Sequence, residues 1–154
     1  MISTRVAFMI IAKEKIVIHR ELKNLLYVVY CFALFQLVTT SDFESFSNNF
    51  IPFKEMTRYR LSSVLFYRNV IGNIALFVPF GYLISDMIFE KTKKYHGIVT
   101  ALLVLITSFT IEVIQMNIGR SFDIDDIILN LVGGIIGFGI FAIIHKFIFR
   151  KKEE

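Results

Sequence analysis

The chain has 154 residues, of which 55% are hydrophobic and 19% are charged, and its mean hydropathy is +0.64. A soluble domain of this size cannot bury so much apolar surface, so the composition excludes a water-soluble globular protein and indicates that lipid is the solvent. The formal net charge of +4 is explained by attraction to anionic inner-leaflet lipid, and it requires no nucleic-acid partner. A chain this short is expected to form one domain, spanning residues 1–154.

Four apolar stretches are candidates to cross a bilayer, whose hydrocarbon core takes roughly 20 helical residues. Their approximate bounds are 25–39, 70–89, 98–118 and 127–149. The expected fold class is therefore all-α, a polytopic membrane bundle of about four transmembrane helices. The N-terminal segment is too short to span and lacks a signal-peptide cleavage pattern, so we interpret it as an interfacial amphipathic segment.

The positions of lysine and arginine predict the orientation, because positively charged loops stay on the cytoplasmic side. With four helices, one side receives most of these residues: Lys13, Lys15, Arg20, Lys23, Lys91, Lys93, Lys94, Arg150, Lys151 and Lys152. The other side receives a long connection, 40–69, and a short turn, 119–126. We therefore predict a multi-pass protein of a cell membrane with both termini in the cytoplasm. On this topology the three histidines are plain cytoplasmic-side residues: His19, His96 and His145.

The long outer connection carries phenylalanines at helix-like spacing. Phe43, Phe46, Phe50 and Phe53 recur among polar residues, and Pro52 interrupts the run. This pattern predicts an amphipathic piece on the outer membrane face, with its rings among the acyl chains. It is either a connector anchored by aromatic residues or a lid over a site beneath it.

Glu112 is the residue within the predicted spans that most strongly indicates a polar site inside the bundle. It precedes the end of the third stretch by about six residues, which places it roughly 9 Å below the outer boundary. An ionised carboxylate there costs on the order of 2.5 to 3.5 kcal/mol, so it must be protonated, paired or facing water. Gln115 follows on the same helical face, and together the two predict a polar stripe directed into the bundle.

The fourth stretch begins with a matching set of polar residues. Asp123 or Asp125 is placed to cap the first turn, and Asp126 lies at the positive end of the helix. Asn130 lies one turn further in on the face of Asp126. For Asp125 the alternative is that its side chain simply faces solvent.

Small and polar residues are also spaced for helix contacts. Gly133 and Gly137 have the small-xxx-small spacing that lets a neighbouring helix approach, which would bring Glu112 near Asn130. Asn73 lies near the outer end of the second stretch. Phe77 and Gly81 share its angular position, and Pro79 predicts a kink between them. Arg68 stands just outside this stretch.

These residues, in this order, resemble the VanZ-like family of small bacterial membrane proteins. The resemblance covers roughly residues 49–137 and is carried by Ile51-Pro52-Phe53, Asn73-Ile-Ala-Leu-Phe77-Val-Pro79-Phe-Gly81, Glu112-Val-Ile-Gln115, Gly119-Arg120-Ser-Phe-Asp123-Ile-Asp125-Asp126, Asn130 and the glycines. The family is named after a protein linked to low-level resistance to the glycopeptide antibiotic teicoplanin. The resemblance therefore implies cell-envelope biology in a bacterial membrane, and it names no reaction.

Four interpretations of the polar set stay open. The first is binding of an envelope component, such as a cell-wall precursor, an envelope polymer or a glycopeptide, through the substrate-binding candidates Arg68, Asn73, Gln115 and Asn130. The second is a membrane-embedded transferase or hydrolase acting on lipid-linked phosphate or sugar, with the catalytic candidates Glu112, Arg120, Asp123 and Asp126. The third is transport, with Glu112 as a proton carrier in a homo-oligomer. The fourth is an internal hydrogen-bond network that holds the last two helices in register.

The sequence predicts no resident cofactor. It contains no Ser-His pairing, no His/Cys metal cluster and no phosphate-binding loop. A divalent cation at Asp123, Asp125 and Asp126 is the exception that the carboxylates allow. Membrane lipids are the expected partners in every interpretation.

Overall fold

The computed structural model describes residues 18–40 and 48–150, and within them the regular structure is entirely helical. In chain order the helices are α2 (Ile18–Thr40), α3 (Lys54–Arg58), α4 (Val64–Phe66), the π-helical turn η1 (Tyr67–Ile71), α5 (Gly72–Thr92), α6 (Gly97–Asn117) and α7 (Ile124–Arg150). The described residues contain no strand, only one isolated bridge between Asn49 and Asp123. The all-α prediction is thus confirmed for this part of the chain.

Three of the described helical segments are long and apolar enough to cross a membrane: Val64–Thr92, Gly97–Asn117 and Ile124–Phe147. They correspond to the second, third and fourth predicted stretches, each with bounds shifted by a few residues. The largest shift is at residue 64, because α4, η1 and α5 form one continuous helical segment. The first predicted stretch, 25–39, lies within α2, which is not among these three helical segments. A transmembrane role for α2, and with it the count of four spans, stays a prediction.

The amphipathic segments are not confirmed. The N-terminal one lies outside the described residues, as do Phe43 and Phe46. Residues 48–53 are extended or turning, and the next helix begins only at Lys54. Phe50 and Phe53 therefore belong to a non-helical segment. Phe53 ends it in a left-handed backbone conformation, with φ of 67°, just before α3.

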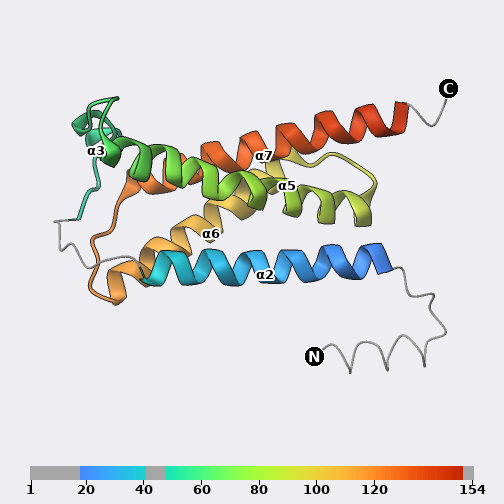
Figure 1. Ribbon diagram of the computed structural model, residues 1–154, viewed down its shortest axis with the longest axis horizontal. Coiled ribbons are helices and arrows are strands. Elements are labelled where there is room, and N and C mark those ends of the chain that lie inside the picture. The colour runs from blue at the N-terminus through green and yellow to red at the C-terminus, as the bar shows by residue number, and fades with distance from the viewer. Residues whose placement is uncertain (1–17, 41–47, 151–154) are drawn as a thin grey trace. The chain divides into compact units, whose positions relative to one another are not determined.

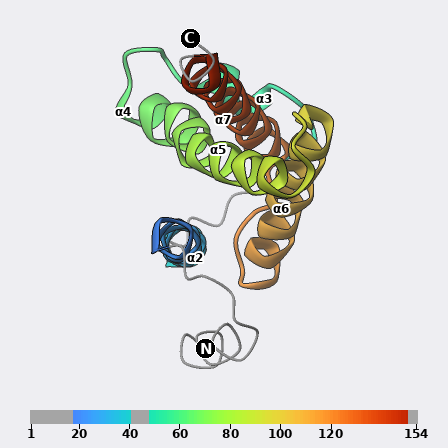
Figure 2. The ribbon, with the colours of Figure 1, turned by 90° about the vertical axis from the view of Figure 1, so that its right-hand side faces the viewer.

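The chain divides into two compact units, residues 1–33 and 34–154, and the second contains the three candidate spans. In this unit α5 and α7 run side by side in the same direction, and α6 runs antiparallel to both (Figures 1 and 2). Many large apolar side chains of these helices are exposed, including Ile98, Ile106 and Phe147 at 80%, 60% and 71%. Exposed apolar surface on this scale is what lipid would cover.

Glycines allow α5 and α7 to touch backbone to backbone. A Cβ at Gly133 would overlap the carbonyl oxygen of Ile74, and one at Gly137 would overlap that of Val78. A Cβ at Gly81 would overlap the backbone of Gly134 in the same way. The small-xxx-small pair is therefore used for close approach, as its spacing predicts.

The partner of this glycine pair differs from the one predicted. Gly133 and Gly137 face α5, not the helix that carries Glu112. The expectation that these two glycines make the contact with α6 is therefore wrong, because spacing indicates a close contact without naming the helix that makes it. Contact with α6 is made instead by Gly134, where an added Cβ would overlap the fully buried side chain of Val104. Asn130 nevertheless contacts the face of α6 that carries Glu112, through its hydrogen bond to Ser108.

Two glycines of α7 provide a direct test of this packing. We expect Gly137→Ala to destabilise the bundle by about 1–3 kcal/mol, because the new methyl group forces α5 away from α7. Gly139→Ala is the matched control, since no atom lies within 4 Å of a Cβ there. It should be neutral or stabilise by up to about 1 kcal/mol through helix propensity. Thermal unfolding in detergent, followed by circular dichroism, compares the two, and equal midpoints would contradict the packing.

Candidate functional site

The turn before α7 is held by carboxylates. Asp123 immediately precedes α7, and its Oδ1 accepts a hydrogen bond of 2.9 Å from the backbone N–H of Asp125. This is the geometry of an N-cap, so the capping role proposed for Asp123 is confirmed. The backbone N–H of Asp123 in turn donates to Oε2 of Glu112 over 2.9 Å. The carboxylate of α6 thus joins the beginning of α7.

Glu112 lies inside the bundle rather than towards lipid. Its side chain is only 2% exposed, and Gln115, three residues further, is 6% exposed. Both therefore belong to the inward face of α6, as the spacing predicts. Ser108, one turn earlier on the same face, is fully buried as well.

Asp126 and Asn73 join the N-terminal ends of α5 and α7. The Asn73 side-chain amide donates to Oδ1 of Asp126 over 2.5 Å. Asp126 lies in the first turn of α7, where the unpaired N–H groups of the helix end favour a negative charge. The sequence placed each residue near the end of its own stretch, but it did not predict that the two are in contact.

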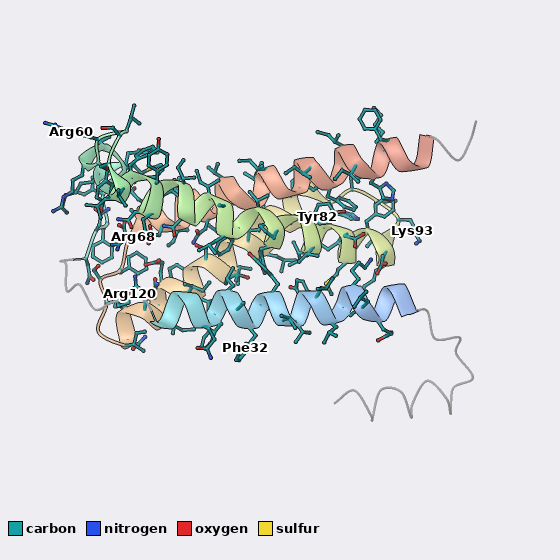
Figure 3. The ribbon with its side chains drawn as sticks, in the orientation of Figure 1. Phe32, Arg60, Arg68, Tyr82, Lys93 and Arg120 are labelled. Carbon is teal, nitrogen blue, oxygen red and sulfur yellow. The ribbon has the colours of Figure 1, made fainter. Side chains whose placement is uncertain are left out.

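Arg120 supplies the positive charge of the turn. It interacts electrostatically with Glu112 and with Asp126, and Asp123 interacts with the same two carboxylates. The backbone N–H of Arg120 donates to the carbonyl oxygen of Gln115 over 3.0 Å, which fixes the turn against the end of α6. Acidic groups from two helices thus interact with one guanidinium. Figure 3 shows Arg120 at one end of the bundle.

Asp125 has a role that the sequence does not reveal. Its side chain is 1% exposed, so the alternative that it faces solvent is wrong. Oδ1 accepts from the backbone N–H of Phe53 over 2.5 Å, and Oδ2 accepts from that of Met56 over 3.2 Å. Both oxygens thus hold the first turn of α3, which ties the outer connection to α7.

Asn48 and Asn49 make a second connection to the same turn, and sequence reasoning missed both. Asn49 pairs with Asp123 through the isolated bridge, and its side-chain amide donates to Oδ1 of Asp123 over 2.8 Å. The side chain of Asn48 accepts from the backbone N–H of Phe122 over 2.9 Å. Residues 74 positions apart make these contacts, so no local periodicity could have indicated them.

Asn130 and Arg68 lie at the margins of the cluster. Asn130 donates from its amide to Ser108 over 2.8 Å, while its buried Oδ1 has no hydrogen-bond partner. Ser108 could have been found as the residue one helical turn before Glu112 on the same face. Arg68 is exposed in η1, and its Nε donates to Asn69 over 3.3 Å. Figure 3 places Arg68 at the same end of the bundle as Arg120.

The described residues contain no group of three or more His, Cys, Asp or Glu side chains that could hold a metal ion. Asp125 uses both of its oxygens on backbone N–H groups, as described above. Asp123 likewise accepts from Asp125 and Asn49. A cation at Asp123, Asp125 and Asp126 therefore stays a prediction.

Comparison with known proteins matches residues 24–145 to the family described as VanZ/LLP1. The chain belongs to the VanZ/LLP1 family. It is 28% identical to Protein VanZ of Enterococcus faecium over 135 residues, which cover 86% of this chain and 76% of that protein. No solved structure matches the chain. The VanZ/LLP1 match includes Glu112, Arg120 and the whole acidic turn.

The role of Asp125 can be tested apart from any activity. We expect Asp125→Ala to speed amide hydrogen exchange in residues 51–58 roughly 5- to 150-fold, because losing a buried acceptor costs about 1–3 kcal/mol. Asp125→Asn keeps one acceptor oxygen and should show a smaller increase. Peptides from 97–107 serve as the internal control and should exchange as in the wild type. Unchanged exchange at Phe53 and Met56 would contradict the capping role.

Proposed function

We propose that this protein is a multi-pass protein of a bacterial cell membrane that binds an extracytoplasmic component of the envelope. In this proposal α2 is the fourth span and both termini face the cytoplasm. The end of the bundle that carries the turn 119–126 then faces outward. The observation that carries the proposal is the gathering of polar groups from three apolar helices at this single end: Asn73, Glu112, Gln115, Arg120, Asp123 and Asp126.

The arrangement favours a ligand role for some of these groups over others. Asp123 and Asp125 are occupied by backbone N–H groups, so their first role is to hold the turn. Glu112 uses Oε2 for Asp123, and Arg120 is half-buried beside it. Glu112 and Arg120 are therefore the pair through which a polar headgroup, sugar or peptide would bind. Low-level resistance to teicoplanin, with which the family's name is associated, is the phenotype that such binding would produce.

The test compares substitutions that change charge while keeping the fold. Glu112→Gln retains an oxygen that can accept from Asp123, and Arg120→Ala removes the guanidinium together with the methylene groups that carry it. We expect both variants to lower teicoplanin tolerance to the level of cells without the protein, at unchanged membrane abundance. The drug retained at the cell surface should rise, because the protein no longer binds the envelope component. Glu90→Gln and Lys94→Ala, exposed positions at the other end of the bundle, are the matched controls. If both site variants stay abundant and fully functional, the binding proposal fails.

A second candidate function follows from the same pair. A carboxylate and a guanidinium that interact within one buried site are the groups that a transferase or hydrolase acting on lipid-linked phosphate or sugar would use. Glu112 would transfer a proton, and Arg120 would stabilise negative charge on the oxygen of the leaving group.

Product analysis separates an enzyme from a binder. Purified protein in nanodiscs is incubated with an envelope lipid extract, and the lipids are then compared by mass spectrometry. As a binder, the wild type should leave every lipid mass unchanged and should retain more of one lipid than Glu112→Gln does. A product that forms with the wild type but not with Glu112→Gln would replace binding by catalysis.

A further inference from the structure

The outer surface of the bundle end differs in charge from its interior. The acidic side chains described above are buried or half-buried, and backbone N–H groups occupy several of their oxygens. Between Asn48 and Ile71, by contrast, the sequence has four basic residues and one acidic residue. The basic residues are all exposed: Lys54, Arg58, Arg60 and Arg68. Figure 3 shows Arg60 and Arg68 at this end, opposite Lys93.

Large apolar side chains are interleaved with these basic residues. Val64 is 82% exposed, Leu61 is 74% exposed, and Phe50, Phe53 and Tyr67 are each about 60% exposed. Exposed apolar groups next to exposed cations are typical of a surface that lies in the interface of a bilayer, where rings and methyl groups enter the acyl region and cations stay with the headgroups. We call this surface, made by Lys54, Arg58, Arg60, Arg68 and the apolar residues just named, the basic rim.

Hydrogen bonds fix the basic rim to the helices. Asp125 holds the start of α3 on α7, as described above. Asn69, next to Arg68, accepts from the Arg68 Nε and donates to the Tyr59 hydroxyl over 3.0 Å. Tyr59 directly precedes Arg60 in the turn after α3. These hydrogen bonds therefore connect the segment of Arg60 to Arg68 in η1. Groups fixed before binding lose less conformational freedom when a ligand arrives.

We infer that the basic rim binds the phosphate headgroups of anionic bilayer lipid, with Arg60 and Arg68 as its main contacts. Arginine suits this ligand because its planar fork donates two parallel hydrogen bonds to phosphate. The position at the end of three apolar helices puts the rim at headgroup depth, which favours lipid over a dissolved ligand. The inference holds in either membrane orientation, since headgroups line both faces of a bilayer. It goes beyond the proposed function, because it involves neither Glu112 nor Arg120.

The chain contains no tryptophan, so one introduced tryptophan reports on the lipid around it. We place it at the rim with Val64→Trp and reconstitute the full chain in phosphatidylcholine vesicles. Brominated phosphatidylglycerol or brominated phosphatidylcholine is then added at equal mole fraction to quench its fluorescence. We expect the anionic lipid to quench at least twofold more strongly. In the background Arg60→Gln with Arg68→Gln, the ratio should fall towards one.

Two controls keep the outcome decisive. Ile98→Trp, exposed at the opposite end of α6, should show a quenching ratio that the arginine substitutions do not change. Leu61→Trp replaces Val64→Trp if that variant does not fold. Equal quenching by the two lipids, no quenching at all, or a preference that survives the loss of all four basic side chains would overturn the inference. These vesicles contain no envelope extract, so the result is independent of the test of Glu112 and Arg120.

Discussion

The backbone contact between α5 and α7 is the constraint on which the polar end of the molecule depends. Because Gly81, Gly133 and Gly137 bring these helices together without side chains between them, the N-terminal ends of α5 and α7 are also close. Asn73 can then reach Asp126 directly. A wider separation would leave both groups facing hydrocarbon without a partner, at a cost that membrane interiors make high.

The second organising feature is the use of carboxylates as acceptors for backbone N–H groups. In the turn 119–126 and the segment 48–58, several backbone N–H groups donate to side chains rather than to backbone carbonyls. Glu112, Asp123 and Asp125 supply the missing acceptors, so buried acids replace the hydrogen bonds that a strand or helix would provide. Part of the polar set is thus structural, so the proposed binding role depends mainly on Arg120 and on Glu112, which has a structural role as well.

Local patterns in the sequence predicted the features that depend on local geometry. Apolar length predicted α5, α6 and α7, and the i, i+3 spacing put Glu112 and Gln115 on one buried face. The position before a helix gave Asp123 or Asp125 as the cap, and the structure shows Asp123 in that role. Contacts between distant segments could not be found in this way. The Asn49–Asp123 bridge leaves no period in the sequence.

Glycine spacing has a related limit. It indicates that a neighbouring helix comes close. It does not indicate which helix, because every neighbouring helix presents the same kind of apolar surface. Here the partner is α5, not α6.

The π-helical turn at Tyr67–Ile71 has a consequence for how the surface and the core are connected. In this turn the N–H of Gly72 bonds to the carbonyl of Tyr67, one residue further back than in an α-helix. Each residue of an α-helix advances the side-chain direction by about 100°. The extra residue in the turn therefore rotates the side chains before Tyr67 about the helix axis. They no longer have the directions that they would have if α5 continued as a regular α-helix. Arg68 and the residues before it therefore face directions that a continuous α-helix would not give them, while Gly81 of α5 keeps its contact with α7.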